Sequence, residues 1–287
     1  MSKIKKAPVS LLIPCKNEEH NIARCIQSVQ WVDEIFVVDS QSSDKTIAIA
    51  ESLGAEVVQF HFKGGWPKKK NWALAKLPFS HEWVLILDAD ECLSPEAEEE
   101  IRKIVTNPDE KHVGYWINRR YFFLGKPLNH AYFPNWNLRL FKHKHGRYEK
   151  ITELNTNSGD NEVHEHVVVN GPTGRLKCLM DHHAFPTIDS FVEKHNRYSN
   201  WEAVVESSST DDDSALQHDA VKGKRRLRRI FRKLPFRPTL RFLYVYFWQK
   251  GILDGWRGYV FARLHAQYEF LSQAKAKAIS RSRKETR

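Results

Sequence analysis

The sequence lacks paired cysteines, long apolar runs and a cleavable leader. Its four cysteines form no C-x-x-C pair and have no regular spacing. This argues against a disulfide framework and a zinc cluster, and favours a reducing, cytosolic setting. No uncharged apolar run approaches the roughly 18 residues that a membrane span needs. The first apolar stretch is short and has no small-residue cleavage site, so we expect no signal peptide. These absences predict a protein that is soluble or lies on a surface.

Acidic residues are scarce at one end of the chain. Residues 222–287 carry 19 lysines and arginines against three acids, whereas acids outnumber these bases in residues 1–221. The net charge of +10 therefore belongs to the last 66 residues.

Within this basic segment, residues 222–241 combine bases on all sides with bulky apolar residues at helical spacing. The pattern predicts an amphipathic helix lying on an anionic bilayer. A nucleic-acid patch is the rival interpretation. We favour the membrane because the apolar residues are bulky and helically spaced, and we expect no nucleic-acid partner. Residues 207–221 have the composition of an exposed linker before this tail of residues 222–287.

Four apolar runs alternate with helical patterns in the first half of the chain. We expect strands at residues 9–14, 34–39, 55–60 and 83–88. Asn17, Asp44 and Ser94 are the expected caps of three of the following helices. Apolar strands that alternate with helices predict an α/β fold with a parallel sheet covered on both faces. Its ligand is expected at the carboxyl ends of the strands.

Polar side chains follow three of these strands. They include Lys16 and Glu18 after the first, Asp39 and Ser40 after the second, and Asp88, Asp90 and Glu91 after the fourth. Residues i and i+2 of an extended chain face the same side, so Asp88 and Asp90 can converge on one point. Two carboxylates together with substrate phosphates are a usual way of holding Mg²⁺ or Mn²⁺. The sequence therefore predicts a metal-dependent site for a nucleotide that carries an activated group.

The segments PCKNEEHNIARCIQSVQWVDEIFVVDSQSSDKT, KKKNWAL and LILDADE carry a resemblance to a known family. In order and spacing they resemble the nucleotide-sugar-binding half of glycosyltransferase family 2, inverting enzymes of the GT-A fold, over residues 8–106. The chain is most similar to the bacterial lipopolysaccharide-core β-glucosyltransferase-like branch. Residues 107–206 would then form the acceptor-binding half of a GT-A domain spanning residues 1–206.

The resemblance implies roles for individual residues. Asp88 and Asp90 correspond to the D-x-D metal motif, and Asp39 to a contact with uracil or ribose. The other implied donor-binding residues are Pro14, Lys16, Glu18, Ser40, Lys70 and Asn71, with Lys70 near the diphosphate. Lys68, Lys69 and Lys70 are expected to open a helix, and a solvated charged surface is the alternative interpretation of this lysine run. Gln41 stands where the family often has glycine, which leaves the donor sugar open.

The second half must supply the base of an inverting transfer, in which an acceptor hydroxyl attacks the anomeric carbon. The family branch carries a V-H-E segment, which matches Glu165, and we predict this residue as the base. Asp90, Glu91 and Glu162 are competing candidates. His182 matches a histidine of the branch that reaches the metal or diphosphate, and His183 is its alternative. For His164 and His166, which flank Glu165, we expect orienting roles.

Together these observations predict an inverting glycosyltransferase that uses a UDP-sugar, with glucose as the expected sugar, and Mg²⁺ or Mn²⁺. The expected acceptor is a lipid-linked or lipopolysaccharide-core saccharide at the inner face of the cytoplasmic membrane. The first rival is a nucleotidyltransferase on a similar fold, although KNEEHN is the wrong chemistry for its phosphate loop. The second is a non-catalytic adaptor that binds nucleotide or membrane.

Overall fold

The computed structural model describes residues 6–149, 166–207, 234 and 236–285. Their contacts divide the chain into two compact units. The described part of the first unit comprises residues 6–120, 134–149 and 166–183, and that of the second comprises residues 121–133, 184–207, 234 and 236–285. The predicted boundaries at residues 206 and 222 stay a prediction.

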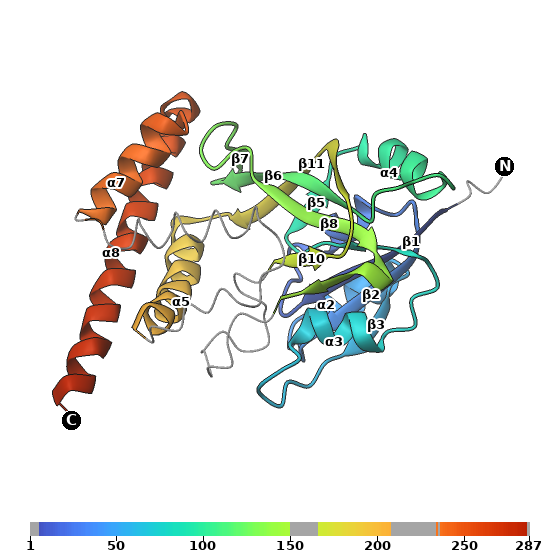
Figure 1. The fold of residues 1–287 in the computed structure, drawn as a ribbon, viewed down its shortest axis with the longest axis horizontal. Coiled ribbons are helices and arrows are strands. Elements are labelled where there is room, and N and C mark those ends of the chain that lie inside the picture. Colours follow the sequence, from blue (N-terminus) through green and yellow to red (C-terminus); the bar gives the residue numbers. More distant parts are fainter. Residues whose placement is uncertain (1–5, 150–165, 208–233, 235, 286–287) are drawn as a thin grey trace. The chain divides into compact units, whose positions relative to one another are not determined.

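Strands and helices alternate in the first half of the chain, as predicted (Figure 1). The described residues between 114 and 185 mainly form strands. The strands are β1 (Ala7–Cys15), β2 (Val32–Asp39), β3 (Glu56–Gln59), β4 (Trp83–Ile86), β5 (Glu91–Leu93), β6 (Gly114–Phe123), β7 (Lys126–Pro127), β8 (Trp136–Lys142), β9 (Gly146–Tyr148), β10 (Val167–Val169) and β11 (Thr173–Phe185). The α-helices are α1 (Ile22–Gln27), α2 (Thr46–Ser52), α3 (Lys69–Lys76), α4 (Ala97–Val105), α5 (Ile188–Ser207), α7 (Arg237–Leu243) and α8 (Gly255–Glu285).

Nine of the described strands form one sheet, with β3, β2, β1, β4, β8, β6, β11 and β5 as neighbours in that order and β7 paired with β6. From β3 to β4 the pairing is parallel. Antiparallel pairing joins β8 to β4 and to β6, and β5 to β11. The predicted α/β fold is therefore confirmed, and the aromatic strands of the second half extend the same sheet.

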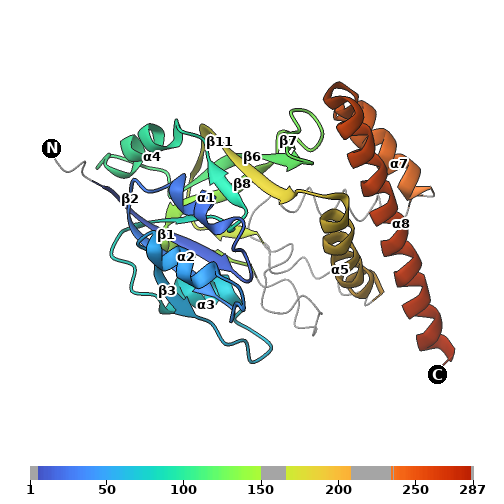
Figure 2. The ribbon, with the colours of Figure 1, turned by 180° about the vertical axis from the view of Figure 1, so that it is seen from behind.

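Alternate residues of β1 explain why helices cover both faces of the parallel strands. Leu11 and Ile13 pack in one apolar cluster with residues of α1, α2 and α4. Leu12 points the other way, into a second cluster with residues of α3. These helices can be followed from both sides in Figures 1 and 2. Helices therefore bury both faces of the parallel strands, and the loops that follow the strands lie at their carboxyl ends.

Two of the predicted helix caps are wrong. α1 begins at Ile22, and Asn17 instead takes a left-handed conformation with φ of 54°. Its side chain accepts a hydrogen bond from Ser43 N–H in another loop. The hydroxyl of Ser94 accepts one from Leu179 N–H rather than capping α4. In both cases a partner distant in sequence outcompetes the local helix end.

The second unit has an aromatic core of its own. Phe123, Phe185 and Phe191 pack there with Val245 and Phe261, and α8 packs along α5 and α7. The described part of the predicted tail thus contributes to this core. No helix within the described ranges is long and apolar enough to cross a membrane. Most of the predicted amphipathic helix, residues 222–233 and 235, lies outside the described residues.

Candidate active site

The carboxylate of Asp88 sits directly after β4 and receives two cations. Lys70 Nζ lies 2.7 Å from Oδ1, and Arg139 Nη2 lies 2.8 Å from Oδ2. Burial alone would raise the pKa of Asp88, but these two positive charges hold it well below its usual range. Asp88 is therefore ionised at neutral pH.

Glu91 contacts both Arg139 and the backbone of Asp88 in the same cluster. Its side chain is fully buried, and Oε1 lies 2.6 Å from Arg139 Nη2 and 3.3 Å from Arg119 Nη1. Oε2 accepts a hydrogen bond of 3.0 Å from the backbone N–H of Asp88. Burial would lower the pKa of Arg139, but Glu91 and Asp88 raise it above its ordinary value. Glu91 thus holds both the backbone and the cation that position Asp88.

Asp90 faces a different partner. Its Oδ1 lies 3.2 Å from His182 Nε2, and both side chains are largely buried. The register of β11 on β5, with His182 opposite Glu91, explains this pairing. The neighbouring His183 donates its backbone N–H to the carbonyl of Asp90. Burial lowers the pKa of His183, with Arg24 acting in the same direction, so this imidazole is neutral at neutral pH.

The residues fit a divalent cation in their donor chemistry. Asp88 and Asp90 offer carboxylate oxygens, and His182 adds an imidazole nitrogen beside Asp90. Within the described ranges, no group of three or more such side chains is arranged to hold a metal. Mg²⁺ is usually bound through one or two carboxylates plus substrate phosphates and water, so the set suits an ion that arrives with a diphosphate.

The loops after β1 and β2 are hydrogen-bonded to each other. Asn17 N–H donates to Ser42 Oγ at 2.8 Å, and Ser43 N–H donates to Asn17 Oδ1 at 2.9 Å. Glu18 N–H donates to Thr46 Oγ1 at 2.8 Å. We call these two loops, residues 16–19 and 40–46, the donor lip. Their mutual bonds fix one edge of the site.

Four predicted donor-binding residues lie in or beside this lip. Pro14 is buried in β1, Lys16 is exposed, and Ser40 is buried and donates its N–H to the carbonyl of Cys15. Asp44, predicted as the cap of α2, lies one residue before the N-cap residue Lys45, and its carboxylate accepts a hydrogen bond from Thr46 N–H at 3.0 Å. The donor contacts of Pro14, Lys16, Glu18 and Ser40 stay predictions.

Asp39 is fully buried at the end of β2. Its Oδ2 accepts hydrogen bonds from Ser42 N–H at 2.8 Å and from Gln59 Nε2 at 3.0 Å, and Ser42 Oγ donates to Oδ1. Burial alone would raise the pKa of Asp39, but these bonds lower it. Asp39 therefore shapes the donor lip, and its contact with a nucleoside stays a prediction.

The lysine run splits at the start of α3. Lys70 reaches Asp88 and lies 5.1 Å from the ring centroid of Tyr148. Lys69 is buried and donates to the carbonyl of Cys15 at 2.8 Å. Asn71 bonds the backbone of Tyr148 twice, donating to its carbonyl and accepting from its N–H, each at 3.0 Å. In this arrangement Asn71 joins α3 to β9, and its predicted role in donor binding stays open.

Replacing Asn71 with alanine is expected to lower the free energy of unfolding by about 1–3 kcal/mol, because two buried backbone groups of Tyr148 lose their partner. Urea denaturation measures this change. Asn170→Ala, at an exposed position after β10, is the control and should leave stability within about 0.5 kcal/mol of wild type. Equal stabilities of the two variants would show that the Asn71 bonds contribute nothing.

Comparisons with known proteins place the chain in a family. The model described as glycosyl transferase family 2 matches residues 10–161, just over half of the chain. The chain belongs to glycosyltransferase family 2. The predicted resemblance is thereby confirmed.

Two relatives align with this glycosyltransferase over nearly its whole length. The lipopolysaccharide core biosynthesis glycosyltransferase LpsC of Rhizobium meliloti is 31% identical, over 95% of this chain and 93% of that protein. An uncharacterized glycosyltransferase of Rickettsia typhi is 29% identical, over 95% of this chain and 87% of that protein. A crystal structure of Mycobacterium tuberculosis glucosyl-3-phosphoglycerate synthase with Mn²⁺, UDP and phosphoglyceric acid matches 40% of this chain and 43% of that chain, with 26% identity and a TM-score of 0.32.

The predicted base of the glycosyltransferase, Glu165, lies outside the described residues, as do Glu162 and His164. The described chain resumes at His166, whose backbone N–H and Nδ1 both contact Glu149 Oε1 at 3.1 Å. β10 then pairs with β9, placing Val167 opposite Tyr148. The segment that follows Glu165 is thus attached to the strand whose Tyr148 contacts Lys70.

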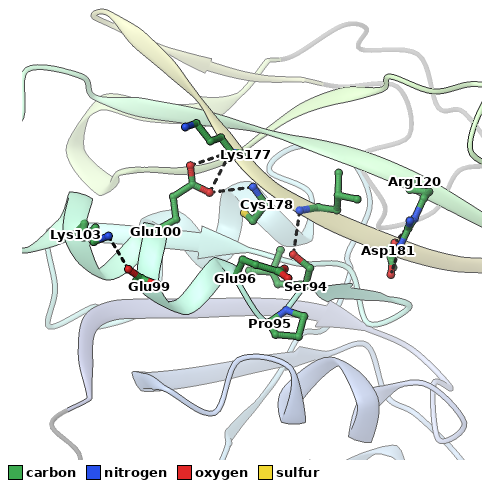
Figure 3. A pocket seen from close by; sticks show the side chains of 12 residues that line it. Ser94, Pro95, Glu96, Glu99, Glu100, Lys103, Arg120, Lys177, Cys178 and Asp181 are labelled. Carbon is green, nitrogen blue, oxygen red and sulfur yellow. Dashed lines mark hydrogen bonds and ion pairs between the residues drawn. The ribbon is translucent and has the colours of Figure 1, made fainter.

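A surface groove runs between α4 and β11 of the glycosyltransferase (Figure 3). Its polar side chains bond within the protein: Glu100 accepts from the N–H groups of Lys177 and Cys178, and Arg120 pairs with Asp181. The predicted donor and metal residues do not line it. The groove is therefore a feature separate from the carboxyl-end cluster.

Sequence reasoning missed Arg139, the most central side chain of the site. Arg139 lies in β8, in a segment rich in aromatic and basic residues, where it is one of several bases. Its position follows from the antiparallel register of β8 on β4, in which Leu140 lies opposite Leu85. A lone arginine between apolar residues, in WNLRLF, was the available signal. Such a residue must be paired when buried.

Proposed function

We propose that this glycosyltransferase transfers a sugar from a UDP-sugar, with UDP-glucose as the expected donor, to a lipid-linked or lipopolysaccharide-core saccharide. The observation that supports this most directly is the cluster after β4, where Lys70 and Arg139 converge on Asp88 beside the Asp90–His182 pair. It combines groups that attract phosphates with groups that ligate cations. The similarity to LpsC, named for lipopolysaccharide core biosynthesis, supports the acceptor class.

The proposed reaction is a single displacement with inversion. The acceptor hydroxyl oxygen attacks the anomeric carbon, the bond from that carbon to the diphosphate oxygen breaks, and Glu165 accepts the hydroxyl proton. Asp88 and Asp90, with His182 beside Asp90, would hold Mg²⁺ or Mn²⁺ together with the diphosphate oxygens, and the bound ion would supply positive charge to the departing UDP. Lys70 adds its own charge at the same place. The donor lip would hold the nucleoside.

Calorimetry with UDP tests the metal part of the proposal. Binding is expected to be at least about tenfold tighter with Mn²⁺ than without it, and Asp90→Asn should remove most of that gain, because one carboxylate ligand is lost. Asp109→Asn, at an exposed loop position, is the matched control and should bind as wild type does. Equal affinities with and without Mn²⁺ would overturn the D-x-D assignment.

Product analysis separates the rival functions. Incubation with UDP-sugars should release UDP, slowly by hydrolysis and faster with acceptor. A nucleotidyltransferase, which catalyses attack at the α-phosphorus, would release a sugar phosphate instead. An adaptor would release nothing. The same screen identifies the donor sugar, because the correct sugar is expected to be hydrolysed fastest.

The expected location is the inner face of the cytoplasmic membrane, where a lipid-linked acceptor would be held. The sequence of residues 222–233 supports this part, with eight bases in twelve residues. Near an anionic leaflet each base contributes on the order of 1 kcal/mol of attraction. This attachment would be peripheral and reversible.

A further inference from the structure

An apolar turn connects α7 to α8 in the second unit. It contains a π-helical turn at Tyr244–Trp248 and a 3₁₀ turn at Gly251–Asp254. Within residues 247–256, which we call the tip, five large apolar side chains are 47–80% exposed. They are Phe247, Trp248, Ile252, Leu253 and Trp256. So many exposed bulky side chains in ten residues mark an interaction site.

The tip is held rigidly by its own backbone. A Cβ on Gly258 would lie 1.8 Å from the carbonyl oxygen of Gly251, and a Cβ on Gly251 would lie 2.7 Å from that of Val245. Only glycine permits these close approaches. The first turn of α8 therefore packs directly on the tip, and the exposed apolar side chains are presented outward from a tight structure.

The one acid of the tip is fully engaged. Asp254 has a side chain only 4% exposed, and its carboxylate accepts hydrogen bonds from the backbone N–H groups of Asn129, His130 and Ala131 at 2.7–3.2 Å. These bonds fix the tip to residues 129–131 of the same unit. Its charge is consequently not displayed to a partner.

The exposed charge of this region is positive. Between residues 236 and 268, all of them described, Asp254 is the single acid, whereas Lys250 and Arg263 are exposed bases. An apolar surface with basic and aromatic side chains complements the interfacial region of an anionic bilayer. Contact between the tips of two copies would instead bring positive charges together. Such a contact would offer Lys250 no negative charge to pair with.

We propose that the tip inserts into the headgroup region of an anionic lipid bilayer, with Trp248, Leu253 and Trp256 entering the apolar boundary. The proposal rests on the membrane location within the proposed function and assigns the anchor to residues 247–256. Attraction of basic residues brings the protein to the surface, and burial of the tip side chains retains it there.

Fluorescence of the full-length protein with vesicles of phosphatidylcholine and phosphatidylglycerol tests insertion. Lipids brominated on the acyl chains should quench part of the tryptophan emission. The double variant Trp248→Phe/Trp256→Phe keeps an apolar tip, so it should still bind while losing that quenching. Equal quenching of wild type and variant would show that other tryptophans contact the lipid and would overturn the proposal.

Vesicle co-sedimentation measures the contribution of the tip to affinity. Trp248→Glu/Leu253→Glu should weaken partitioning by about tenfold or more, because two large apolar side chains no longer enter the bilayer. Phe270→Glu is the matched control, since Phe270 is 58% exposed on α8 but about 21 Å further along that helix than Trp256. It should partition as the wild type does. Wild-type binding should also persist partly at about 1 M NaCl, where charges are screened within about 3 Å.

The outcomes separate this proposal from the proposed function. If wild type binds vesicles and the double Glu variant binds equally well, the tip is not the anchor although the membrane location stands. If wild type ignores vesicles yet binds UDP with Mn²⁺, the membrane location fails and the enzymatic proposal stands. A light-scattering mass of a dimer that Trp248→Glu/Leu253→Glu converts to monomer would assign the tip to a second copy and overturn the bilayer.

Discussion

Replacing Arg139 with methionine is expected to lower the free energy of unfolding by about 3–5 kcal/mol, measured by urea denaturation. Arg139 is buried and lies within 2.8 Å of both Asp88 and Glu91. Without Arg139, the fully buried Glu91 keeps only the more distant cation Arg119. Asp88 keeps only Lys70. Breaking a buried ion pair by removing one member typically costs this amount.

The control is Arg120→Met. Arg120 also pairs with a carboxylate, Asp181, but its side chain is 25% exposed and Asp181 is 18% exposed. Water therefore solvates what the substitution leaves behind, and the cost is expected to be about 1 kcal/mol. If Arg139→Met costs no more than Arg120→Met, the buried cluster is not what stabilises this part of the sheet.

The stabilities of the wild type and of Arg139→Met should also depend differently on pH. The pKa of Asp88 in the folded protein lies below its value of about 3.9 in an unfolded chain. The resulting stabilisation is present above about pH 4 and is lost as the pH falls below it. Because Arg139→Met removes one cause of this depression, the stability difference between wild type and variant is expected to narrow as the solution is acidified.

Glu165→Gln is expected to lower the rate of sugar transfer by roughly 10²-fold or more while leaving the affinity for UDP unchanged. The amide cannot accept the proton of the attacking hydroxyl, but it preserves the size of the side chain. Initial rates with acceptor and calorimetry with UDP measure the two quantities. The loss should appear in kcat rather than in donor binding.

Glu162→Gln is the matched control and should retain wild-type transfer. Among the other candidates, Glu91 is fully buried and bound to Arg139 and to the backbone of Asp88, which suits a positioning role better than proton abstraction. Asp90 is held by His182. Full activity of Glu165→Gln would reassign the base to one of the remaining carboxylates. Full activity of Asp90→Asn would exclude Asp90 as the base.

The sequence predicted the parallel half of the fold because each strand carries its own signal. The apolar runs at β1, β2 and β4 can be recognised without knowledge of their neighbours. The structure places Asp88 and Asp90 between β4 and β5, after the carboxyl end of β4 as expected, and their role in binding a ligand stays a prediction. The contacts that decide their electrostatics come from β8 and α3. Such contacts depend on strand register and on long-range packing, for which a single sequence contains no direct signal.

The helical tail shows the same limit. The sequence predicted an amphipathic helix for residues 222–241 only, and for the apolar residues that follow it did not say which side chains face protein and which face outward. In the structure Val245 and Phe261 enter the core of the second unit, whereas Trp248 and Trp256 are exposed. The distinction depends on packing with Phe123, Phe185 and Phe191, which are distant in sequence.

The bonds within the donor lip bear on the entropy of binding. Asn17 and Glu18 are already tied to Ser42, Ser43 and Thr46 before any donor arrives. The conformational freedom of these two loops is thus given up when the chain folds, and little of it remains to be lost when a nucleotide enters. Under the proposed function, in which the lip holds the nucleoside, we therefore expect a small entropic cost of ordering these loops and a correspondingly larger share of the contact free energy in the affinity.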